Sequence, residues 1–426
     1  MCYDIRGCVF GAPKCIEKGM KIMVQIAILG FGVVGSGTAE VLTENKKLIE
    51  SHCKEEINIK YILDLRDFPD HPLGDRVVHD VSVILNDPEV RVVVEMMGGS
   101  HPAYEFSKSA LEAGKSVVTS NKEVVANFGA ELLEIAASKG VYYLFEASVG
   151  GGIPIIRPLQ NDLASNEILS VSGILNGTTN FILTKMKNEG ADFATALKEA
   201  QANGFAEANP AADVEGLDAA RKIVILAALA FGILVSPKDI SVEGITGITA
   251  EQTAMAETFG CAIKLIGHTE RINGKVYAAV APHMVPASNP VSHVEGVFNG
   301  ILVDANMLGR ALFYGAGAGK LPTASAVVAD ILGAVSAIGS PKLPKWKVAE
   351  ASDLADPEDR VCRRCFVLEG CAKCAEKTKA HFGYDSYVVN ENGTFSFLSR
   401  PMNGREAAEA LAACKKELVW TMPVLD

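Results

Sequence analysis

The chain has 426 residues, a length typical of two or three domains, and hydrophobic residues make up 49% of it, which is enough for substantial cores. Its formal net charge is −11 and no basic run stands out, which argues against nucleic acid or an anionic membrane surface as the main partner. No stretch is long and apolar enough to span a bilayer; the nearest, residues 223–235, reads as a buried helix.

Residues 1–22 match no periodic element and lack the continuous apolar segment of a secretory signal. We expect them to be a disordered extension, or the product of a start placed upstream of Met20 or Met23. Without a visible secretory signal, we expect the ten cysteines to remain thiols in a cytoplasmic protein.

The first regular element is a short apolar run, residues 24–29, which predicts a buried parallel strand. Gly30, Gly32 and Gly35 follow at G-x-G-x-x-G spacing and lead into a helical pattern. The first glycine permits a tight turn, the second lets a pyrophosphate approach the backbone, and the third lets helix and strand pack closely. A position between strand and helix favours a dinucleotide site over an ordinary glycine-rich turn. The cofactor-binding residues expected here are Gly30, Phe31, Gly32, Val33, Val34 and Gly35.

A second strand, residues 57–63, ends at Asp64. This carboxylate could accept the ribose hydroxyls of NAD, whereas Arg66 could grip the 2′-phosphate of NADP. A plain surface ion pair is the third interpretation. The sequence therefore leaves the choice between NAD and NADP open.

Further strands are predicted over residues 90–97, 115–120 and 142–145, so that strands and helices alternate as in a doubly wound parallel sheet. Ligands of such sheets bind outside the carboxyl ends of the strands. This places Gly98, Ser120, Asn121 and Lys122 near the cofactor. For Lys122, an ordinary surface lysine is the alternative.

Residues 146–154, EASVGGGIP, combine an acidic residue with three consecutive glycines. Backbone carbonyls exposed by such a loop are hard oxygen ligands, so that with Glu146 they could coordinate a cation. A flexible hinge between domains is the alternative. Residues 169–174 then predict a strand, and Asn176 follows where it could cap a helix or hold a polar ligand.

The segment 204–225 carries the most chemistry. Asp218 and Lys222 are four residues apart and therefore share one helix face. Because the residues after Lys222 are almost wholly apolar, we expect burial to lower its pKa toward the range of an acid–base catalyst, with the carboxylate beside it orienting the ammonium. A solvated salt bridge is the alternative. Glu207, in a turn before the helix, is placed to grip an amine or hydroxyl.

Six segments occur in this order: GFGVVGSG, TSNKE, EASVGGGIPI, LNGTTNFI, GFAEANPAADVEGLDAARK and YGAGAGKLPTASAV. Together they closely resemble homoserine dehydrogenase, over residues 24–339. The resemblance implies reversible conversion of L-homoserine to L-aspartate 4-semialdehyde with NAD or NADP, on the way to threonine and methionine. The alternatives are another Rossmann dehydrogenase of amino or hydroxy acids, and a nucleotide-sensing protein without turnover.

The resemblance also implies roles for residues around the predicted substrate site. Lys222 matches the proton donor and Lys122 matches an active-site lysine, which is a rival or relay for the proton. Glu207 matches the glutamate that binds homoserine. Asp213 and Asp218 match the remaining carboxylates of the substrate site.

A monovalent-cation site, usually occupied by sodium, is implied for Glu146 and the carbonyl groups of Val149, Gly151 and Ile153. Gly317 matches a late cofactor contact, after which the chain would return to the nucleotide domain through a helix at residues 324–335. A homodimer is implied as well. Strands at residues 242–248, 276–285 and 297–303 would belong to the domain that forms the subunit contact.

Residues 341–359 are rich in Pro, Asp and Lys and read as a linker. Beyond them the order strand-helix-strand-strand-helix-strand predicts a small ferredoxin-like module. It resembles the ACT regulatory domain, which suggests an amino-acid effector such as threonine. Two C-x2-C pairs, Cys362 with Cys365 and Cys371 with Cys374, are separated by only five residues. A zinc ribbon needs a longer interval, so ordinary thiols are favoured over tetrahedral zinc.

The predicted fold is therefore α/β with three domains. Residues 23–145 and 312–340 form a Rossmann-type, doubly wound NAD(P)-binding domain. Residues 146–311 form an α+β catalytic and dimerisation domain, and residues 360–426 form the βαββαβ regulatory domain.

Overall fold

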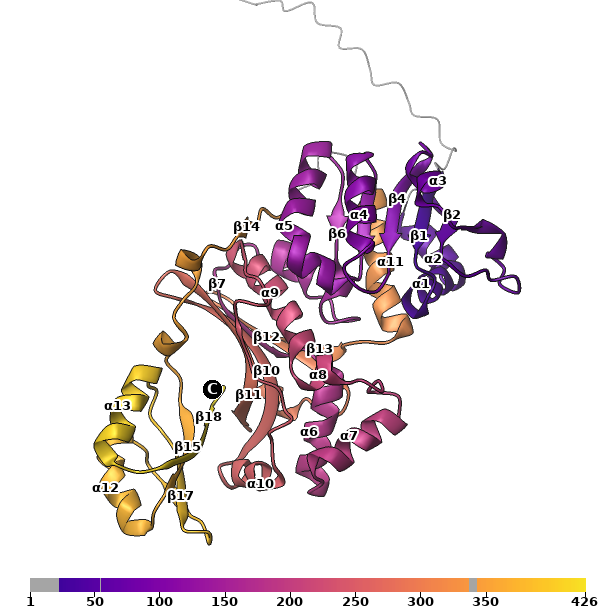
Figure 1. Cartoon of the computed structure of the whole chain (residues 1–426). Helices are drawn as coiled ribbons and strands as arrows, with labels where there is room; N and C mark the ends of the chain where they lie inside the picture. Colours follow the sequence, from indigo (N-terminus) through magenta and orange to yellow (C-terminus); the bar gives the residue numbers. More distant parts are fainter. Residues whose placement is uncertain (1–22, 54, 337–342) are drawn as a thin grey trace, which may run out of the picture.

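The computed structural model describes residues 23–53, 55–336 and 343–426. The expectation for residues 1–22 therefore lies outside the described residues. The chain forms three modules, which we call the nucleotide, catalytic and C-terminal modules (Figure 1). No helix within the described ranges is long and apolar enough to cross a membrane.

The nucleotide module is a six-stranded, wholly parallel sheet in the order β3-β2-β1-β4-β5-β6, as predicted for a Rossmann-type fold. Alternate valines of β4 and β5 enter different clusters: Val93 and Val117 pack into one, Val92 and Val118 into the other, so helices cover both faces. The strands are β1 (Met23–Leu29), β2 (Glu56–Leu63), β3 (Val77–Val78), β4 (Val90–Glu95), β5 (Ser116–Thr119) and β6 (Tyr143–Leu144). The helices are α1 (Val33–Glu44), α2 (Lys46–His52), α3 (Val81–Leu85), α4 (Ala103–Glu112) and α5 (Lys122–Lys139).

A sixth helix, α11 (Lys320–Ser336), reaches this module from far along the chain (Figure 1, orange among indigo and purple). Its Val327 and Ile331 are buried in the same cluster as Ile26 and Ile28 of β1. The predicted helix at residues 324–335 is therefore confirmed, and it packs on the nucleotide sheet.

The catalytic module is a mixed sheet in the order β13-β12-β7-β10-β11-β9, with helices on one side (Figure 1). Its β10–β11 hairpin pairs without a shift over twelve residues of each strand. Its strands are β7 (Ile168–Ile174), β9 (Ser241–Val242), β10 (Cys261–Ile272), β11 (Lys275–Pro286), β12 (Phe298–Ala305) and β13 (Gly309–Ala316). Its helices are α6 (Gly177–Glu189), α7 (Phe193–Ala202), α8 (Ala211–Val214), α9 (Leu217–Phe231) and α10 (Ala250–Thr258).

Three sequence expectations for this module need correction. The strand expected at 242–248 stops at Val242, because Ile245 turns back to donate its N–H to the carbonyl of Val214. The helix expected at 223–235 ends at Phe231, because Gly232 adopts a left-handed conformation with φ of +74°. The boundary expected at residue 312 falls inside β13, which pairs with β12 as far as Ala316.

Residues 343–359 contact the other modules along much of their length. β14 (Lys347–Val348) pairs in parallel with β8 (Ile233–Leu234), and the ring of Trp346 lies edge-on to Phe145 at 5.4 Å between centroids. The expected linker is thus fixed along the other two modules.

The C-terminal module is an antiparallel sheet in the order β16-β17-β15-β18 with two helices, the ferredoxin-like arrangement predicted from the sequence. Aromatic residues of the strands and of α12 form its core, among them Phe366, Phe382 and Phe397. Its elements are β15 (Arg364–Glu369), α12 (Ala372–Phe382), β16 (Tyr387–Val389), β17 (Thr394–Leu398), α13 (Gly404–Cys414) and β18 (Leu418–Pro423).

Candidate active site

The glycine-rich turn between β1 and α1 has the geometry expected of a phosphate loop. Gly30 adopts φ of +89°, which side-chain-bearing residues rarely adopt. A Cβ on Gly35 would lie 2.1 Å from the carbonyl oxygen of Gly30, so only glycine allows the helix this close to the turn. A Cβ on Gly32, by contrast, would meet no atom of the described residues within 4 Å, which leaves that side of the backbone open at the start of α1.

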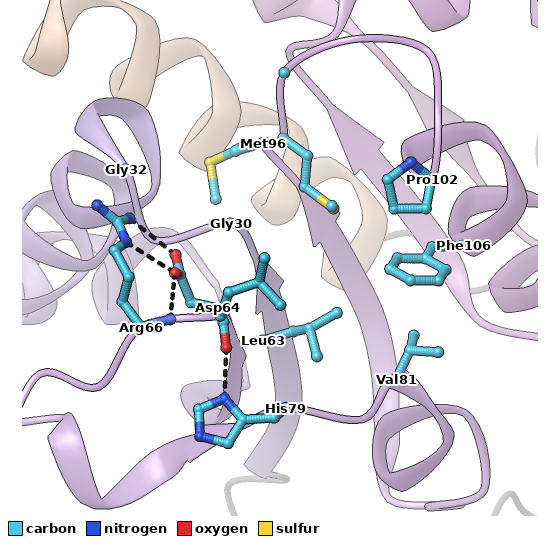
Figure 2. Close-up of a pocket in the computed structure, with 13 residues that line it drawn as sticks. Gly30, Gly32, Leu63, Asp64, Arg66, His79, Val81, Met96, Pro102 and Phe106 are labelled. Carbon is cyan, nitrogen blue, oxygen red and sulfur yellow. Dashed lines mark hydrogen bonds and ion pairs between the residues drawn. The ribbon is translucent and has the colours of Figure 1, made fainter.

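A pocket of about 540 Å³ opens beside this turn (Figure 2). Asp64 and Arg66 lie on one side of it, and Pro102, Phe106 and Val81 lie on the other. Its remaining lining comes from Gly30, Gly32, Leu63, Leu65, His79, Met96, Met97 and Gly98. Of these residues, the sequence predicts only the glycines as cofactor contacts. The apolar residues lie at or just after strand ends and belong to no recognisable motif.

The polar side of this pocket is an ion pair between neighbours in sequence. Arg66 donates from Nε and Nη2 to the two oxygens of Asp64, each at 3.0 Å, and the N–H of Phe31 donates to the same carboxylate at 2.8 Å. The hydrogen bonds from Arg66 lower the pKa of Asp64 to about 2, against a smaller opposing effect of burial. The guanidinium of Arg66 also lies over the ring of Phe68, and this contact helps to hold Arg66 beside Asp64.

The loop residues predicted to bind cofactor differ in what their side chains face. The ring of Phe31 packs edge-on against Phe68 and His71, and the side chain of Val33 is exposed. These two residues would therefore contact a cofactor through their backbone. Val34 is half-buried at the start of α1.

At the carboxyl ends of β4 and β5, Asn121 caps helix α5. Its side-chain oxygen accepts from the N–H groups of Glu123 and Val124, and its amide donates to the carbonyl of Gly99 at 2.8 Å. The side chain thus shapes the loop that follows β4, while Ser120 stands half-buried before it. The cap also fixes the start of the helix, and with it the position of its first residue, Lys122.

The carboxylate of Asp218 joins two lysines from different modules. Lys122 of α5 lies 2.8 Å from Oδ1, and Lys222, one turn along α9, lies 2.7 Å from Oδ2. Lys222 also donates to the carbonyl of Leu175 at 2.7 Å. An ammonium has three N–H groups, so Lys222 keeps one for a further acceptor.

Burial and charge act in opposite directions on this cluster. Burial lowers the pKa of Lys222 because it disfavours the ammonium, and Asp218 opposes that effect. Burial alone would raise the pKa of Asp218, but the two ammonium groups and the amide of Asn176 outweigh it, and the pKa falls well below its usual range. Asp218 is therefore a carboxylate, and Lys222 is a lysine that gives up its proton more readily than usual.

Asn176 belongs to this cluster as well, a link to the carboxylates that the sequence did not indicate. Its oxygen caps α6 by accepting from the N–H of Thr179, the use expected of it, while its amide donates to Asp213 at 2.8 Å and to Asp218 at 2.9 Å. The amide therefore holds both carboxylates on one side of the site.

Glu207 stands apart from the cluster. It is exposed in the loop after α7, and its backbone carbonyl accepts from the amide of Gln201 at 3.1 Å. Within the described parts of the chain its side chain makes no hydrogen bond or ion pair with the lysines or with Asp218. Asp213 is brought to the cluster, whereas Glu207 is left on the loop beside it.

The turn that contains Glu146 is tightly packed. The Glu146 carboxylate is buried and accepts from the N–H groups of Ile155, Ile156 and Arg157 at 2.7–2.8 Å. Its own N–H donates to Asp330 of α11 at 2.7 Å. Glu146 therefore fastens the crossing between two modules.

The carbonyl groups of Val149, Gly151 and Ile153 lie in the same turn, in a largely buried stretch of chain. Among the described residues none of the three accepts a backbone hydrogen bond. Gly317 lies close by, because a Cβ on Gly151 would be 2.4 Å from its carbonyl oxygen. The predicted cation ligands and the predicted late cofactor contact are thus neighbours.

The four cysteines of the C-x2-C pairs do not converge. No group of three or more His, Cys, Asp or Glu side chains within the described ranges could hold a metal ion. Cys362 and Cys365 are buried, whereas Cys371 is exposed. The preference for ordinary thiols over zinc stays a prediction.

Two family models match the chain. One is described as homoserine dehydrogenase and matches residues 154–332; the other is the NAD binding domain of homoserine dehydrogenase and matches residues 30–146. A homoserine dehydrogenase of Synechocystis is 44% identical over 324 residues, 74% of each chain.

Solved structures agree. The crystal structure of a homoserine dehydrogenase from Thiobacillus denitrificans superposes with a TM-score of 0.85 at 34% identity and covers 96% of this chain and 100% of that one. A hyperthermophilic archaeal homoserine dehydrogenase in complex with NADPH gives a TM-score of 0.64 at 28% identity and covers 75% of this chain and 100% of that one.

Proposed function

The chain belongs to the homoserine dehydrogenase family, oxidoreductases that interconvert L-homoserine and L-aspartate 4-semialdehyde with a nicotinamide cofactor, and we propose that Lys122, Lys222 and Asp218 form its catalytic centre. One observation carries the proposal: a single buried carboxylate pairs with a lysine from the nucleotide module and with a lysine from the catalytic module. The reacting alcohol has to lie between the same two modules, because it must meet the cofactor there.

We assign the proton transfer to Lys222. When bound, the nicotinamide supplies the hydride chemistry, so the protein has to handle the proton of the substrate hydroxyl. In semialdehyde reduction the Lys222 ammonium donates a proton to the aldehyde oxygen, and in homoserine oxidation the neutral amine takes it from the hydroxyl. The lowered pKa makes the neutral form accessible, and the unused N–H supplies the hydrogen bond.

Lys122 is the rival or the relay. Its side chain is 40% exposed, against 10% for Lys222, so it can exchange protons with solvent. Because both lysines pair with Asp218, Lys122 lies near the same substrate position as Lys222. In this assignment Lys122 orients the substrate oxygen and returns protons to the site, whereas Lys222 acts on the reacting atom.

Glu207 and Asp213 are proposed to bind the ammonium group of homoserine. Asp213 already shares the amide of Asn176 with Asp218, which puts it next to the catalytic carboxylate. Glu207 lies on an exposed loop and would have to reach across to the substrate. We therefore expect Glu207 to act on substrate affinity and not on the chemical step.

For the cofactor, we propose that both forms are accepted. Asp64 would hold the ribose hydroxyls of NAD, and Arg66 would turn to the 2′-phosphate of NADP. In the ion pair the charges of Asp64 and Arg66 neutralise each other, so the pair favours neither NAD nor NADP. The archaeal neighbour that binds NADPH supports NADP as one of the two.

We propose a monovalent cation, sodium, at the turn after Glu146. The carbonyl groups of Val149, Gly151 and Ile153 fit such an ion, since they are hard oxygen donors in a largely buried turn and accept no backbone hydrogen bond from the loops and turns of the described residues. The Glu146 carboxylate supplies the negative charge, although three N–H groups already share it. Such an ion would fasten the crossing between modules and take no part in proton transfer.

A homodimer is proposed to form at β13. This strand is an edge of the catalytic sheet, and its Leu312 and Tyr314 are exposed, with Phe298 of the neighbouring strand stacked on Tyr314. Exposed apolar side chains on an unpaired edge are typical of an interface. Sedimentation of Tyr314→Asp would show a shift toward monomer; an unchanged dimer would exclude this edge.

The C-terminal module is proposed to respond to an amino-acid effector such as threonine. Support comes from a chain of contacts. Arg360 lies 3.4 Å from the half-buried Glu270, which lies 3.2 Å from the buried His268. The other ring nitrogen of His268 is 2.7 Å from the Ser172 hydroxyl of β7. That strand leads directly to Leu175, the carbonyl acceptor of Lys222. Activity that stays constant in millimolar threonine would count against this effector.

Spectrophotometric assay of homoserine oxidation tests the catalytic proposal, with NAD and NADP measured side by side. Reduction of at least one cofactor is expected. Absence of turnover with both would remove the enzymatic account, whereas normal kcat in Lys222→Ala would remove only the role of that lysine.

A further inference from the structure

Two thiols of the C-terminal module lie against each other at the start of α12. Sγ of Cys371 is 3.7 Å from Sγ of Cys374, and no other cysteine pair within the described residues makes such a contact. Cys371 is exposed and Cys374 is half-exposed, so small molecules can reach the pair. A disulfide bond needs the sulfur atoms at roughly 2.05 Å, a shortening that side-chain rotation can supply.

The backbone holds the pair one helical turn apart. Cys371 is the N-cap of α12, an eleven-residue helix, and its carbonyl accepts from the N–H of Cys374 at 2.8 Å and of Ala375 at 3.0 Å. Cys374 therefore stands in the first turn, where the helix dipole and the free N–H groups favour a thiolate.

Charge favours the thiolate of Cys374 as well. Hydrogen bonds from the start of the helix and from the side chain of Lys416 lower the pKa of Cys374 to about 7. The interaction is reciprocal, since the same contact raises the pKa of Lys416. Lys416 comes from the segment after α13, so two separate parts of the module build this environment.

Packing positions the Cys374 sulfur. A Cβ on Gly370 would lie 2.8 Å from Cβ and 3.0 Å from Sγ of Cys374, and φ of +144° at Gly370 favours glycine as well. Cys365 of β15 offers the contrast: it is buried, and burial raises the pKa of its thiol to about 12. Of the two C-x2-C pairs, only the second combines contact, access and an acidic thiol.

We propose that Cys371 and Cys374 form a redox site, a dithiol that a small-molecule disulfide of the glutathione type oxidises reversibly to an intramolecular disulfide. The Cys374 thiolate attacks one sulfur of the external disulfide, which forms a mixed disulfide and expels the first thiolate. The Cys371 thiolate then attacks Sγ of Cys374 and expels the second. Two protein thiols are oxidised by two electrons, one disulfide is reduced to two thiols, and the two thiol protons pass through solvent to the thiolates that leave.

Peptide mapping of the full chain tests this directly. The reduced protein is incubated with excess oxidised glutathione, free thiols are alkylated, and the denatured chain is cut with trypsin. Because Lys373 lies between the two cysteines, cleavage puts them on separate peptides, residues 365–373 and 374–377. We expect these two peptides to be recovered joined by a Cys371–Cys374 disulfide, and to separate after treatment with dithiothreitol.

Three variants sharpen the test. Cys371→Ser removes the second step, so the Cys374–glutathione mixed disulfide should accumulate. Cys414→Ser is the matched control, a half-exposed cysteine of the same module, and should leave the cross-link intact. Lys416→Met should move the pH midpoint of Cys374 alkylation by iodoacetamide upward from about 7. At pH 7 the wild-type thiol should react roughly threefold faster than an ordinary cysteine.

Three results would overturn the proposal. The first is full alkylation of both cysteines after incubation with oxidised glutathione. The second is a separate glutathione on each cysteine with no cross-link. The third is a disulfide that joins either of them to Cys414. None of these measurements depends on dehydrogenase activity, so the proposal stands or falls apart from the catalytic one.

Discussion

Lys122 and Asp218 connect the two halves of the site, with Nζ of Lys122 2.8 Å from Oδ1 of Asp218. Lys122 is the first residue of α5 and Asp218 the second of α9, so the pair ties the start of a nucleotide-module helix to the start of a catalytic-module helix. The other oxygen of Asp218 accepts from Lys222. Two positive charges thus depend on one carboxylate.

Asp218→Asn is expected to lower kcat by about 10²-fold or more, because an amide keeps the shape but leaves two ammonium groups without a counter-charge. Removing one partner of a buried ion pair also costs about 3–5 kcal/mol of stability, so thermal unfolding should be measured alongside steady-state kinetics. Glu215→Gln is the control, since it removes a nearby but exposed carboxylate. Near-normal kcat in Asp218→Asn would show that the lysines do not need it.

The pH dependence of homoserine oxidation should report on Lys222. Burial lowers its pKa below the ordinary 10.5, so the neutral base forms as pH rises and the rate should climb to a plateau with a midpoint below 10.5. The reverse reaction needs the ammonium and should decline over the same range. Lys222→Arg, which cannot lose its proton, should abolish the rise. If Lys122→Arg abolishes it instead, the two lysines exchange roles.

Asp64 should favour binding of NAD, and Arg66 should favour binding of NADP. Arg66→Ala is expected to raise KM for NADP by about tenfold or more, the loss of one charge-assisted contact to phosphate, with a smaller effect on NAD. Asp64→Asn should do the reverse, because it weakens the acceptor for ribose hydroxyls and removes a charge that repels the 2′-phosphate. KM values for both cofactors in both variants check this. Parallel changes for NAD and NADP would mean that neither residue discriminates.

Glu95 should make stability fall as pH rises from acid to neutral. This carboxyl group is buried at the end of β4, and burial raises its pKa from 4.5 to about 6. Between those values the folded protein binds more protons than the unfolded chain, so unfolding free energy decreases with pH by about 2 kcal/mol. Glu95→Gln should lack this component. Denaturant unfolding at pH 4.5 and pH 7 measures the difference. An equal change of unfolding free energy with pH in the wild-type protein and in Glu95→Gln would refute the prediction.

The nucleotide module was predictable because its signals are local. The apolar run before Gly30 and the spacing to Gly35 specify strand, turn and helix within a few residues, and Gly30 adopts a φ that favours glycine. The long strand β10 was not predicted, for the opposite reason. It carries Lys264 and His268 in buried positions, and their partners, such as the carbonyl of Val294 for Lys264, come from distant parts of the chain.

The candidate site was predictable only in part. The pairing of Asp218 with Lys222 follows from helical spacing, and both lie where that spacing predicts. The double role of Asn176 does not follow, because capping α6 and bridging Asp213 to Asp218 are indistinguishable until three segments come together. The same holds for Glu207, whose side chain the described structure leaves apart from the lysines.

The return of α11 means that the described backbone crosses between the nucleotide and catalytic modules after Glu146 and crosses back before Lys320. Both passages run side by side, since the N–H of Gly152 donates to the carbonyl of Ala316 at 3.1 Å. Residues 343–348 join the two modules as well, through Trp346 against Phe145 and β14 beside β8. A rotation of one module against the other would therefore disturb both places, and it would change the distance between Lys122 and Asp218. A cation bound as proposed in the turn after Glu146 would stiffen the two paired crossings.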